Sequence, residues 1–268
     1  MFTGYLQFKP KLFDAEYNIN AVNSLIGNNH QKCDLLVMPE LANSGYLFSS
    51  AQEAFDASEK IPDGKFCTNL FNLAEKYNTN IVSGINERAG DKLYNSAVLV
   101  TPAGDCFVYR KTHLFLEEKL WFTPGDTGLN VFEINGDFGK VKTGIMICFD
   151  WIFPEAARTL ALKGAQVITH PSNLVLQYCQ KAMFSRAVEN RVYTITANRT
   201  GRETNSGKEL FFTGSSVIVD PKGNYLSSAG ESDELISVVE IDPSLALDKN
   251  VTTMNDIIKD RRTDLYNL

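Results

Sequence analysis

The chain lacks the closely spaced cysteine pairs that bind zinc and the cysteine density of a disulfide-bonded domain. No two of its cysteines form a CxxC pair, and the five are an odd number at wide, unequal spacings: Cys33, Cys67, Cys106, Cys148 and Cys179. This pattern argues against a disulfide framework and against a cysteine zinc site. The three histidines, His30, His113 and His170, are also too far apart in sequence to indicate a metal site.

Long apolar runs and an excess of positive charge are missing as well. No run approaches the roughly 18 apolar residues of a membrane-spanning helix, and the first residues lack the basic and apolar regions of a signal peptide. With 26 basic and 32 acidic residues, the net charge of -6 offers no general attraction to nucleic acids or anionic membranes. Neither a phosphate-binding loop nor a dinucleotide glycine pattern is present. We expect a cytoplasmic protein with free thiols and without a cofactor, metal, nucleic-acid or membrane partner.

What is present is the composition of an ordinary globular domain. The chain has 268 residues, of which 44% are hydrophobic and 22% charged, so it can bury a large core without a metal or disulfide. No repeat or linker divides it. We therefore expect one domain over residues 1–242 and a polar, helical C-terminal extension over 243–268, which is either a solvated end or an arm that docks on a second subunit.

Helical and strand patterns alternate along the chain, which indicates an α/β protein. Apolar spacing predicts helices that start after Asp14 and over residues 65–77, 154–163 and 177–190. Strand patterns occupy residues 3–8, 33–38, 81–88, 93–101, 105–111, 140–148, 166–170, 193–197, 215–220, 225–228 and 235–241. The connections between the strands from 81 to 111 are so short that those strands must be antiparallel neighbours. The sheet is therefore expected to be mixed.

Cys148 occupies a position that suits a nucleophile. It ends an apolar strand just before the helix that opens at Pro154. A thiol at such a turn lies near a helix N-terminus, whose partial positive charge favours the thiolate. The alternative is an unreactive cysteine packed at the end of a strand, which is the commoner fate of cysteine.

Two charged residues follow other strand ends in the same way. Glu40 comes directly after the apolar run that ends at Pro39, where partial burial would raise its pKa toward the range of a general base. Lys111 closes a third strand, and its ammonium could bind a developing oxyanion. Taken singly, each residue could equally be an ordinary polar group at the end of a strand.

Together, these strand ends and their flanks resemble the nitrilase superfamily of carbon–nitrogen hydrolases over nearly the whole chain. The matching segments, in the family's order and spacing, are Leu36–Glu40 with Ser44–Tyr46, Tyr109–Phe115, Glu118–Gly125, and Gly144–Glu155 with Ala157 and Arg158. The resemblance implies a four-layer αββα sandwich with two mixed β-sheets. It also implies dimerisation, which would make the C-terminal extension an intersubunit arm.

The resemblance assigns roles to individual residues. The family's catalytic glutamate, lysine and nucleophilic cysteine fall on Glu40, Lys111 and Cys148, and the backbone N–H of Phe149 would complete the oxyanion hole. The family's second glutamate falls on Glu118, with the adjacent Glu117 as an alternative. By their places in the matching segments, four further residues are candidate pocket walls: Tyr46, Trp121, Trp151 and Asn173.

The implied activity is hydrolysis of a small linear amide through a cysteine thioester. The segment Cys148–Trp151, Cys-Phe-Asp-Trp, resembles amidase-like branches. The segment from Met254 to Arg262 instead resembles the tails of small prokaryotic aliphatic nitrilases. An amide is our first expectation, and a small aliphatic nitrile or an N-carbamoyl amine is the alternative. A catalytically idle binding protein or an ammonia-supplying subunit is disfavoured, because all three catalytic positions are filled and no ATP-binding motif is present.

Overall fold

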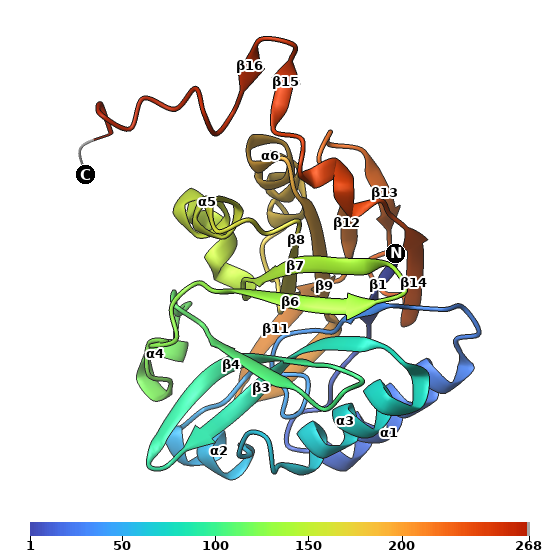
Figure 1. Ribbon diagram of the computed structural model, residues 1–268. Coiled ribbons are helices and arrows are strands. Elements are labelled where there is room, and N and C mark those ends of the chain that lie inside the picture. Colours follow the sequence, from blue (N-terminus) through green and yellow to red (C-terminus); the bar gives the residue numbers. More distant parts are fainter. Residues whose placement is uncertain (267–268) are drawn as a thin grey trace.

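Two six-stranded β-sheets form the centre of the molecule, and helices cover the outer face of each (Figure 1). The computed structural model describes residues 1–266. Both sheets contain parallel and antiparallel neighbours. The order of layers is helix, sheet, sheet, helix, which confirms the expected αββα sandwich with two mixed sheets.

The first sheet carries the strands that lead to Glu40 and Lys111. Its strands, in spatial order, are β14 (Leu235–Glu240), β1 (Phe2–Gln7), β2 (Leu35–Val37), β3 (Asn80–Ala89), β4 (Lys92–Val100) and β5 (Cys106–Arg110). Strands β1, β2 and β3 are parallel, whereas β4 is antiparallel to both β3 and β5. Since β5 therefore runs in the same direction as β2, the chain leaves both strands at the same edge of the sheet.

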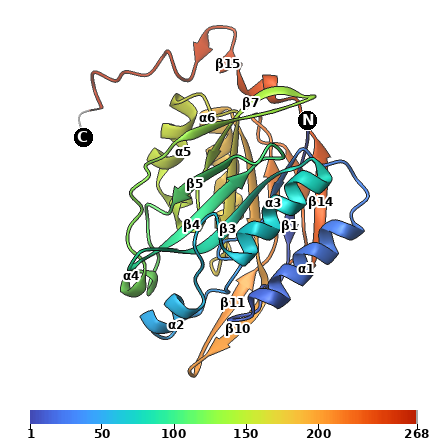
Figure 2. The same cartoon turned by 60° about the horizontal axis from the view of Figure 1, so that its bottom comes forward.

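The helices α1 (Ala15–Asn28) and α3 (Lys65–Tyr77) cover the outer face of this sheet, as Figure 2 shows. The side chain of Asp14 caps α1 by accepting a hydrogen bond from the backbone N–H of Tyr17, as the sequence indicated. Val22 on α1 and Leu70 on α3 are fully buried in one cluster with the strand residue Leu36 and its neighbours. This cluster is the outer of the two main cores.

The second sheet carries Cys148. Its strands, in spatial order, are β13 (Tyr225–Ser228), β12 (Val217–Val219), β9 (Tyr193–Asn198), β8 (Val167–Ser172), β7 (Gly139–Ile145) and β6 (Val131–Gly136). Helices α5 (Pro154–Leu162) and α6 (Cys179–Asn190) lie on its outer side (Figure 1). The inner core includes Tyr5 and Val82 from the first sheet together with Ile145 and Ile168 from the second. Packing between the two sheets therefore fixes the strand ends that carry the candidate residues.

Several shorter elements were not expected from the sequence. They are α2 (Ala51–Asp56), α4 (Glu118–Trp121), the 3-10 helix η1 (Cys148–Ile152), the edge strand β6 and the hairpin of β10 (Thr200–Asn205) and β11 (Lys208–Thr213). The hairpin turn, Ser206 and Gly207, has positive φ at both residues, as a two-residue type I′ turn requires. This hairpin matters below because Glu203 on β10 contacts the backbone of Tyr46, and the start of β11 lines a cavity beside Glu118.

The prediction of a helical C-terminal extension is wrong beyond its first turn. The segment is helical at the 3-10 helix η2 (Pro243–Ala246) and then forms a small hairpin of β15 (Asn250–Thr252) and β16 (Asn255–Asp256). The β-branched run Val251–Thr253 favours extended backbone over helix. Figure 1 shows this segment leaving the body of the molecule beyond α6.

No helix in the described part of the chain is both long enough and apolar enough to span a bilayer.

Gly84 on β3 gives a direct test of how the fold positions Glu40. A Cβ atom at residue 84 would lie 2.3 Å from the Cα atom of Glu40 and 2.5 Å from the backbone nitrogen of Leu41. Because both are backbone atoms, they cannot turn aside, and we expect Gly84→Ala to lower the free energy of unfolding by roughly 1–3 kcal/mol.

Gly27→Ala in α1 is the matched control, because its added methyl group would meet only the Tyr77 hydroxyl, at 3.7 Å. That change should leave stability equal or raise it by up to about 1 kcal/mol. Urea unfolding measures both variants. Equal stability of Gly84→Ala and the unaltered protein would contradict the close approach of β3 to Glu40.

Candidate active site

The structure brings Glu40, Lys111 and Cys148 together from three separate strand ends. Glu40 follows β2, Lys111 follows β5, and Cys148 begins η1 just after β7. The ammonium Nζ of Lys111 lies 2.6 Å from Oε1 of Glu40, and both side chains are fully buried. Cys148 is 5% exposed, and the charges of Glu40 and Lys111 both shift the pKa of its thiol.

Glu118 completes this cluster, and Glu117 does not. Oε1 of Glu118 lies 2.9 Å from Nζ of Lys111 and accepts a hydrogen bond of 2.8 Å from the hydroxyl of Tyr46. Its Oε2 accepts a hydrogen bond from the backbone N–H of Phe115. Glu117 lies at the surface, where it pairs with Lys208 at the tip of the β10–β11 hairpin. The geometry therefore favours Glu118 as the second glutamate.

The environment keeps the ammonium charged. Burial alone would lower the pKa of Lys111, but the carboxylates of Glu118 and Glu40 more than compensate, and they raise its pKa well above the ordinary value. Burial also raises the pKa of Glu118, while Lys111 opposes that shift. The cluster is a single buried cation held by two buried carboxylates.

The surroundings of Cys148 raise the pKa of its thiol, which is the opposite direction to the one that the sequence argument gave. Burial first, and then the negative charge of Glu40, raise its pKa well above the ordinary value, and Lys111 offsets only part of this. The dipole of α5 does not lower the pKa of the thiol as expected, because α5 begins only at Pro154, beyond the end of η1. The effect of a helix dipole falls off within the first turn. A base beside the thiol is therefore required before attack.

The pKa of the thiol does not by itself distinguish Cys148 from the other cysteines. Burial raises the pKa of Cys33 to about 12 and that of Cys106 to about 11, and it also raises the pKa values of Cys67 and Cys179. Within residues 1–266, Cys148 is the cysteine that lies beside a buried lysine and two buried carboxylates. Its neighbours, and not its acidity, mark it as the candidate nucleophile.

A strained turn presents Cys148. Its φ of 42° lies in the left-handed region, which costs a residue with a side chain of the order of 1–3 kcal/mol. The buried carboxylate of Asp150 holds the turn by accepting hydrogen bonds from the backbone N–H of Ile147, at 2.9 Å, and the hydroxyl of Tyr109, at 2.7 Å. The ring nitrogen Nε2 of His170 lies 2.8 Å from the carbonyl oxygen of Cys148. These contacts fix the cysteine from both sheets.

Glu40 keeps one oxygen uncommitted. Its Oε1 accepts hydrogen bonds from Lys111 and from the side-chain amide of Asn95, the latter at 2.7 Å. Its Oε2 is buried and has no hydrogen-bond partner among residues 1–266. A buried carboxylate oxygen without a partner is costly unless a substrate or proton occupies it during function.

The four candidate pocket residues divide between two cavities. Trp151 and Asn173 line a small cleft together with Cys148 and Phe149. Neither polar atom of the buried Asn173 side chain has a partner within the described chain. Tyr46 and Trp121 line a second cavity of about 450 Å³, which Glu118 also lines. All four thus lie near the cluster, on two different walls.

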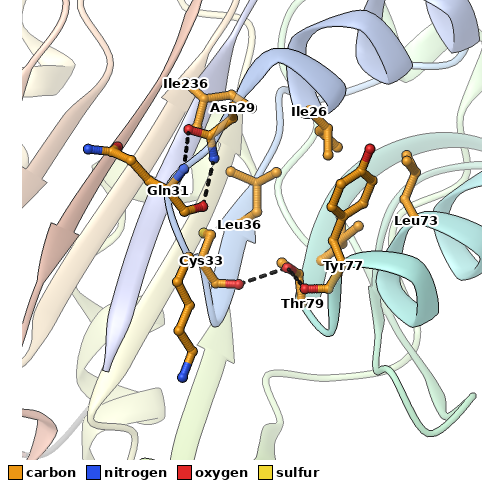
Figure 3. Close-up of a pocket in the computed structure, with 11 residues that line it drawn as sticks. Ile26, Asn29, Gln31, Cys33, Leu36, Leu73, Tyr77, Thr79 and Ile236 are labelled. Carbon is orange, nitrogen blue, oxygen red and sulfur yellow. Dashed lines mark hydrogen bonds between the residues drawn. The ribbon is translucent and has the colours of Figure 1, made fainter.

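A third cavity, shown in Figure 3, is unrelated to this cluster. It measures about 60 Å³ and lies between the ends of α1 and α3 and the first sheet, near Cys33. Thr79 donates a hydrogen bond to the carbonyl oxygen of Cys33 there, and the thiol of Cys33 donates to the carbonyl oxygen of Leu35. None of the candidate site residues lines it.

Sequence analysis missed the residues that hold the site from behind. Glu203 on β10 accepts hydrogen bonds from the backbone N–H groups of Tyr46, at 2.9 Å, and Leu47, at 2.6 Å. The fully buried Arg199 pairs with its other oxygen at 2.8 Å. The Ser206–Gly207 turn signal could have revealed the hairpin, but nothing local indicates that Glu203 faces residues more than 150 positions away.

Comparison with known proteins identifies the family. The model of the carbon–nitrogen hydrolase family matches residues 3–248. The chain belongs to this family. A protein of Pyrococcus abyssi named nitrilase is 47% identical over 263 residues, which cover 98% of this chain and 97% of that protein. An (R)-stereoselective amidase from a Pseudomonas species is 35% identical, with 93% and 87% covered.

A solved structure agrees with the fold of this carbon–nitrogen hydrolase. The crystal structure of a carbon–nitrogen hydrolase from Helicobacter pylori is similar with a TM-score of 0.86 and 30% identity, and the match covers all of this chain and 97% of the other. The nitrilase-superfamily resemblance of the sequence is thereby confirmed. The relatives carry both nitrilase and amidase names, so the family alone does not select the substrate.

The pKa of Cys148 yields a prediction about its reactivity with iodoacetamide. Because the negative charge of Glu40 raises the pKa of the thiol, we expect Glu40→Gln to shift the pH dependence of alkylation at Cys148 toward lower pH. Glu117→Gln, which changes an exposed carboxylate outside the cluster, should leave the profile in place. Mass spectrometry of the labelled peptides follows the reaction. A shift toward higher pH in Glu40→Gln would contradict the electrostatic account.

Proposed function

We propose that this carbon–nitrogen hydrolase cleaves a linear amide through a thioester on Cys148, releasing ammonia and a carboxylic acid. The observation that carries the proposal is the position of the Lys111 ammonium. It is held between Glu40 and Glu118 beside a buried thiol, while one oxygen of Glu40 remains uncommitted. A fixed, buried cation is suited to stabilising charge that develops on a substrate oxygen.

In the first half-reaction, Glu40 accepts the thiol proton as the sulfur of Cys148 attacks the amide carbonyl carbon. The negative charge that forms on the carbonyl oxygen is stabilised by Lys111 and by the backbone N–H of Phe149, which follows Cys148 in the same turn. The carbon–nitrogen bond then breaks, and the proton on Glu40 passes to the leaving nitrogen. Ammonia departs, and the acyl group remains on sulfur.

In the second half-reaction, water replaces ammonia. Glu40, now ionised again, takes a proton from water as the water oxygen attacks the thioester carbonyl carbon. The carbon–sulfur bond breaks, the thiolate recovers the proton from Glu40, and the carboxylic acid leaves. Glu118 helps to keep Lys111 charged and in place throughout both halves, because it provides the second counter-charge.

The unpartnered groups of the site support an amide over a nitrile. Oε2 of Glu40 and Oδ1 of Asn173 are buried acceptors that lack partners within residues 1–266, and Nδ2 of Asn173 is a buried donor that also lacks one. An amide carries N–H donors that could satisfy such acceptors, whereas a nitrile carries none. The alternative is a small aliphatic nitrile, which the name of the 47% identical relative from Pyrococcus abyssi favours.

Ammonia release from four substrate classes tests both candidates. The panel contains short aliphatic amides, ω-amides of dicarboxylic acids, N-carbamoyl amines and small nitriles. We expect amides to be hydrolysed and Cys148→Ala to lose turnover. Cys106→Ala, which removes a half-buried thiol outside the site, is the control and should remain active. Nitrile turnover without amide turnover would overturn the reaction, and undiminished activity of Cys148→Ala would overturn the residue assignment.

We further propose that residues 1–242 form the hydrolase domain and that the extension from residue 243 contacts a second copy of the chain. Large apolar side chains are exposed on the segment that leaves the body in Figure 1, among them Leu247, Val251 and Met254. Exposed apolar groups on a projecting segment are suited to burial at an interface.

Removal of residues 249–268 tests this role. Sedimentation should find the full chain as a dimer and the shortened chain as a monomer, because the shortened chain lacks Val251 and Met254. Circular dichroism provides the control that the shortened chain remains folded. A monomeric full chain, or a shortened chain that still dimerises, would contradict the proposal.

A further inference from the structure

The larger cavity beside Glu118 has the character of a binding chamber for an apolar group. It measures about 450 Å³, within the size range of small-molecule sites. Apolar side chains make up much of its wall: Leu47, Phe48, Leu116, Trp121 and Leu210. Phe48 and Trp121 meet edge to face, with ring centroids 6.4 Å apart, which stiffens that side.

The chamber adjoins the reacting groups through Tyr46 and Glu118. Both residues line it, and the Tyr46 hydroxyl donates to the same Glu118 oxygen that contacts Lys111. Cys148 itself lines the smaller cleft. The chamber is next to the reacting groups by way of Glu118, which lines it and contacts Lys111.

The charges at the chamber rim are paired with one another. Lys208, at the tip of the β10–β11 hairpin, forms an ion pair with Glu117 beside α4. Glu209, the next residue of the hairpin, pairs with Arg202 across the two strands at 3.3 Å. No net charge of either sign remains among these four side chains, so the rim has no free partner for a charged end of a substrate.

We propose that this chamber receives the uncharged, apolar acyl chain of the substrate and that the β10–β11 hairpin sets its size. The inference rests on the proposed amide hydrolysis and adds the substrate class: primary amides with aliphatic chains longer than that of acetamide, without a terminal charge. A terminal carboxylate or ammonium would have to enter an apolar space or separate the Lys208–Glu117 pair. The specificity-determining residues are Leu210, two residues after Lys208, and Leu116, next to Glu117, because both line the chamber.

Binding to the Cys148→Ala variant tests the chamber independently of turnover. Isothermal titration would compare acetamide, hexanamide, 6-aminohexanamide and the monoamide of adipic acid. We expect hexanamide to bind at least about tenfold more tightly than acetamide, since each buried methylene group adds affinity. The two charged analogues should bind more weakly than hexanamide. Equal binding of hexanamide and acetamide, or tighter binding of a charged analogue, would overturn the proposal.

Filling the chamber should weaken or abolish the preference for hexanamide. Leu210→Trp in the Cys148→Ala background should reduce the ratio of hexanamide to acetamide affinity by about tenfold. Leu116→Trp provides a second filling variant, and its exposed position makes it independent of the packing of β11. Leu226→Trp on β13 makes the same change away from the chamber and should keep the ratio. An unchanged ratio in the folded filling variants would overturn the chamber assignment.

The outcome separates this inference from the proposed function. Ammonia release from acetamide by the unaltered protein, without any advantage for hexanamide in binding, would leave amide hydrolysis standing and remove the chamber. Tight hexanamide binding that Leu210→Trp abolishes, without release of ammonia from any amide, would leave the chamber standing and remove the amide reaction.

Discussion

The ammonium of Lys111 is fully buried, and the arrangement of the site follows from that one charge. A buried cation is strongly disfavoured unless opposite charges surround it, and Glu40 and Glu118 provide them at 2.6 and 2.9 Å. Each carboxylate is in turn fixed in position by hydrogen bonds and by packing. For Glu40 these include Asn95 and the close approach of Gly84, and for Glu118 they include Tyr46 and the backbone of Phe115.

The same requirement joins distant parts of the chain. Tyr46 is fixed because Glu203, on the β10–β11 hairpin, binds its backbone N–H, and Arg199 in turn balances the charge of Glu203. On the other side, Asp150 connects the turn of Cys148 to Tyr109 on β5, and thus one sheet to the other. The strained backbone of Cys148 persists because these contacts determine it from two directions.

Sequence reasoning recovered what local patterns and motif order encode. The helices α1, α3, α5 and α6 and most strands follow from apolar spacing, and the strand-end positions of Glu40, Lys111 and Cys148 were visible as polar residues after apolar runs. The choice of Glu118 over Glu117 needed the structure, because adjacent residues on a short helix can face opposite environments. Glu203 and Asn95 act through contacts distant in sequence, which no local pattern contains.

Two physical expectations failed for identifiable reasons. The thiol of Cys148 is less acidic than its place before a helix suggested, because burial and Glu40 outweigh a helix that starts six residues later. The C-terminal extension was expected to be helical, yet its β-branched residues form a hairpin. In both cases a weak local preference was overruled by the surroundings.

The thioester is the central claim, and rapid quenching of the reaction with mass analysis of the Cys148 peptide tests it most directly. With butyramide as substrate, the account predicts a transient peptide whose mass has increased by a butyryl group less one hydrogen, which shows that nitrogen has left before water attacks. A transient adduct that retains the amide nitrogen, or turnover with the acyl group on another residue, would contradict it.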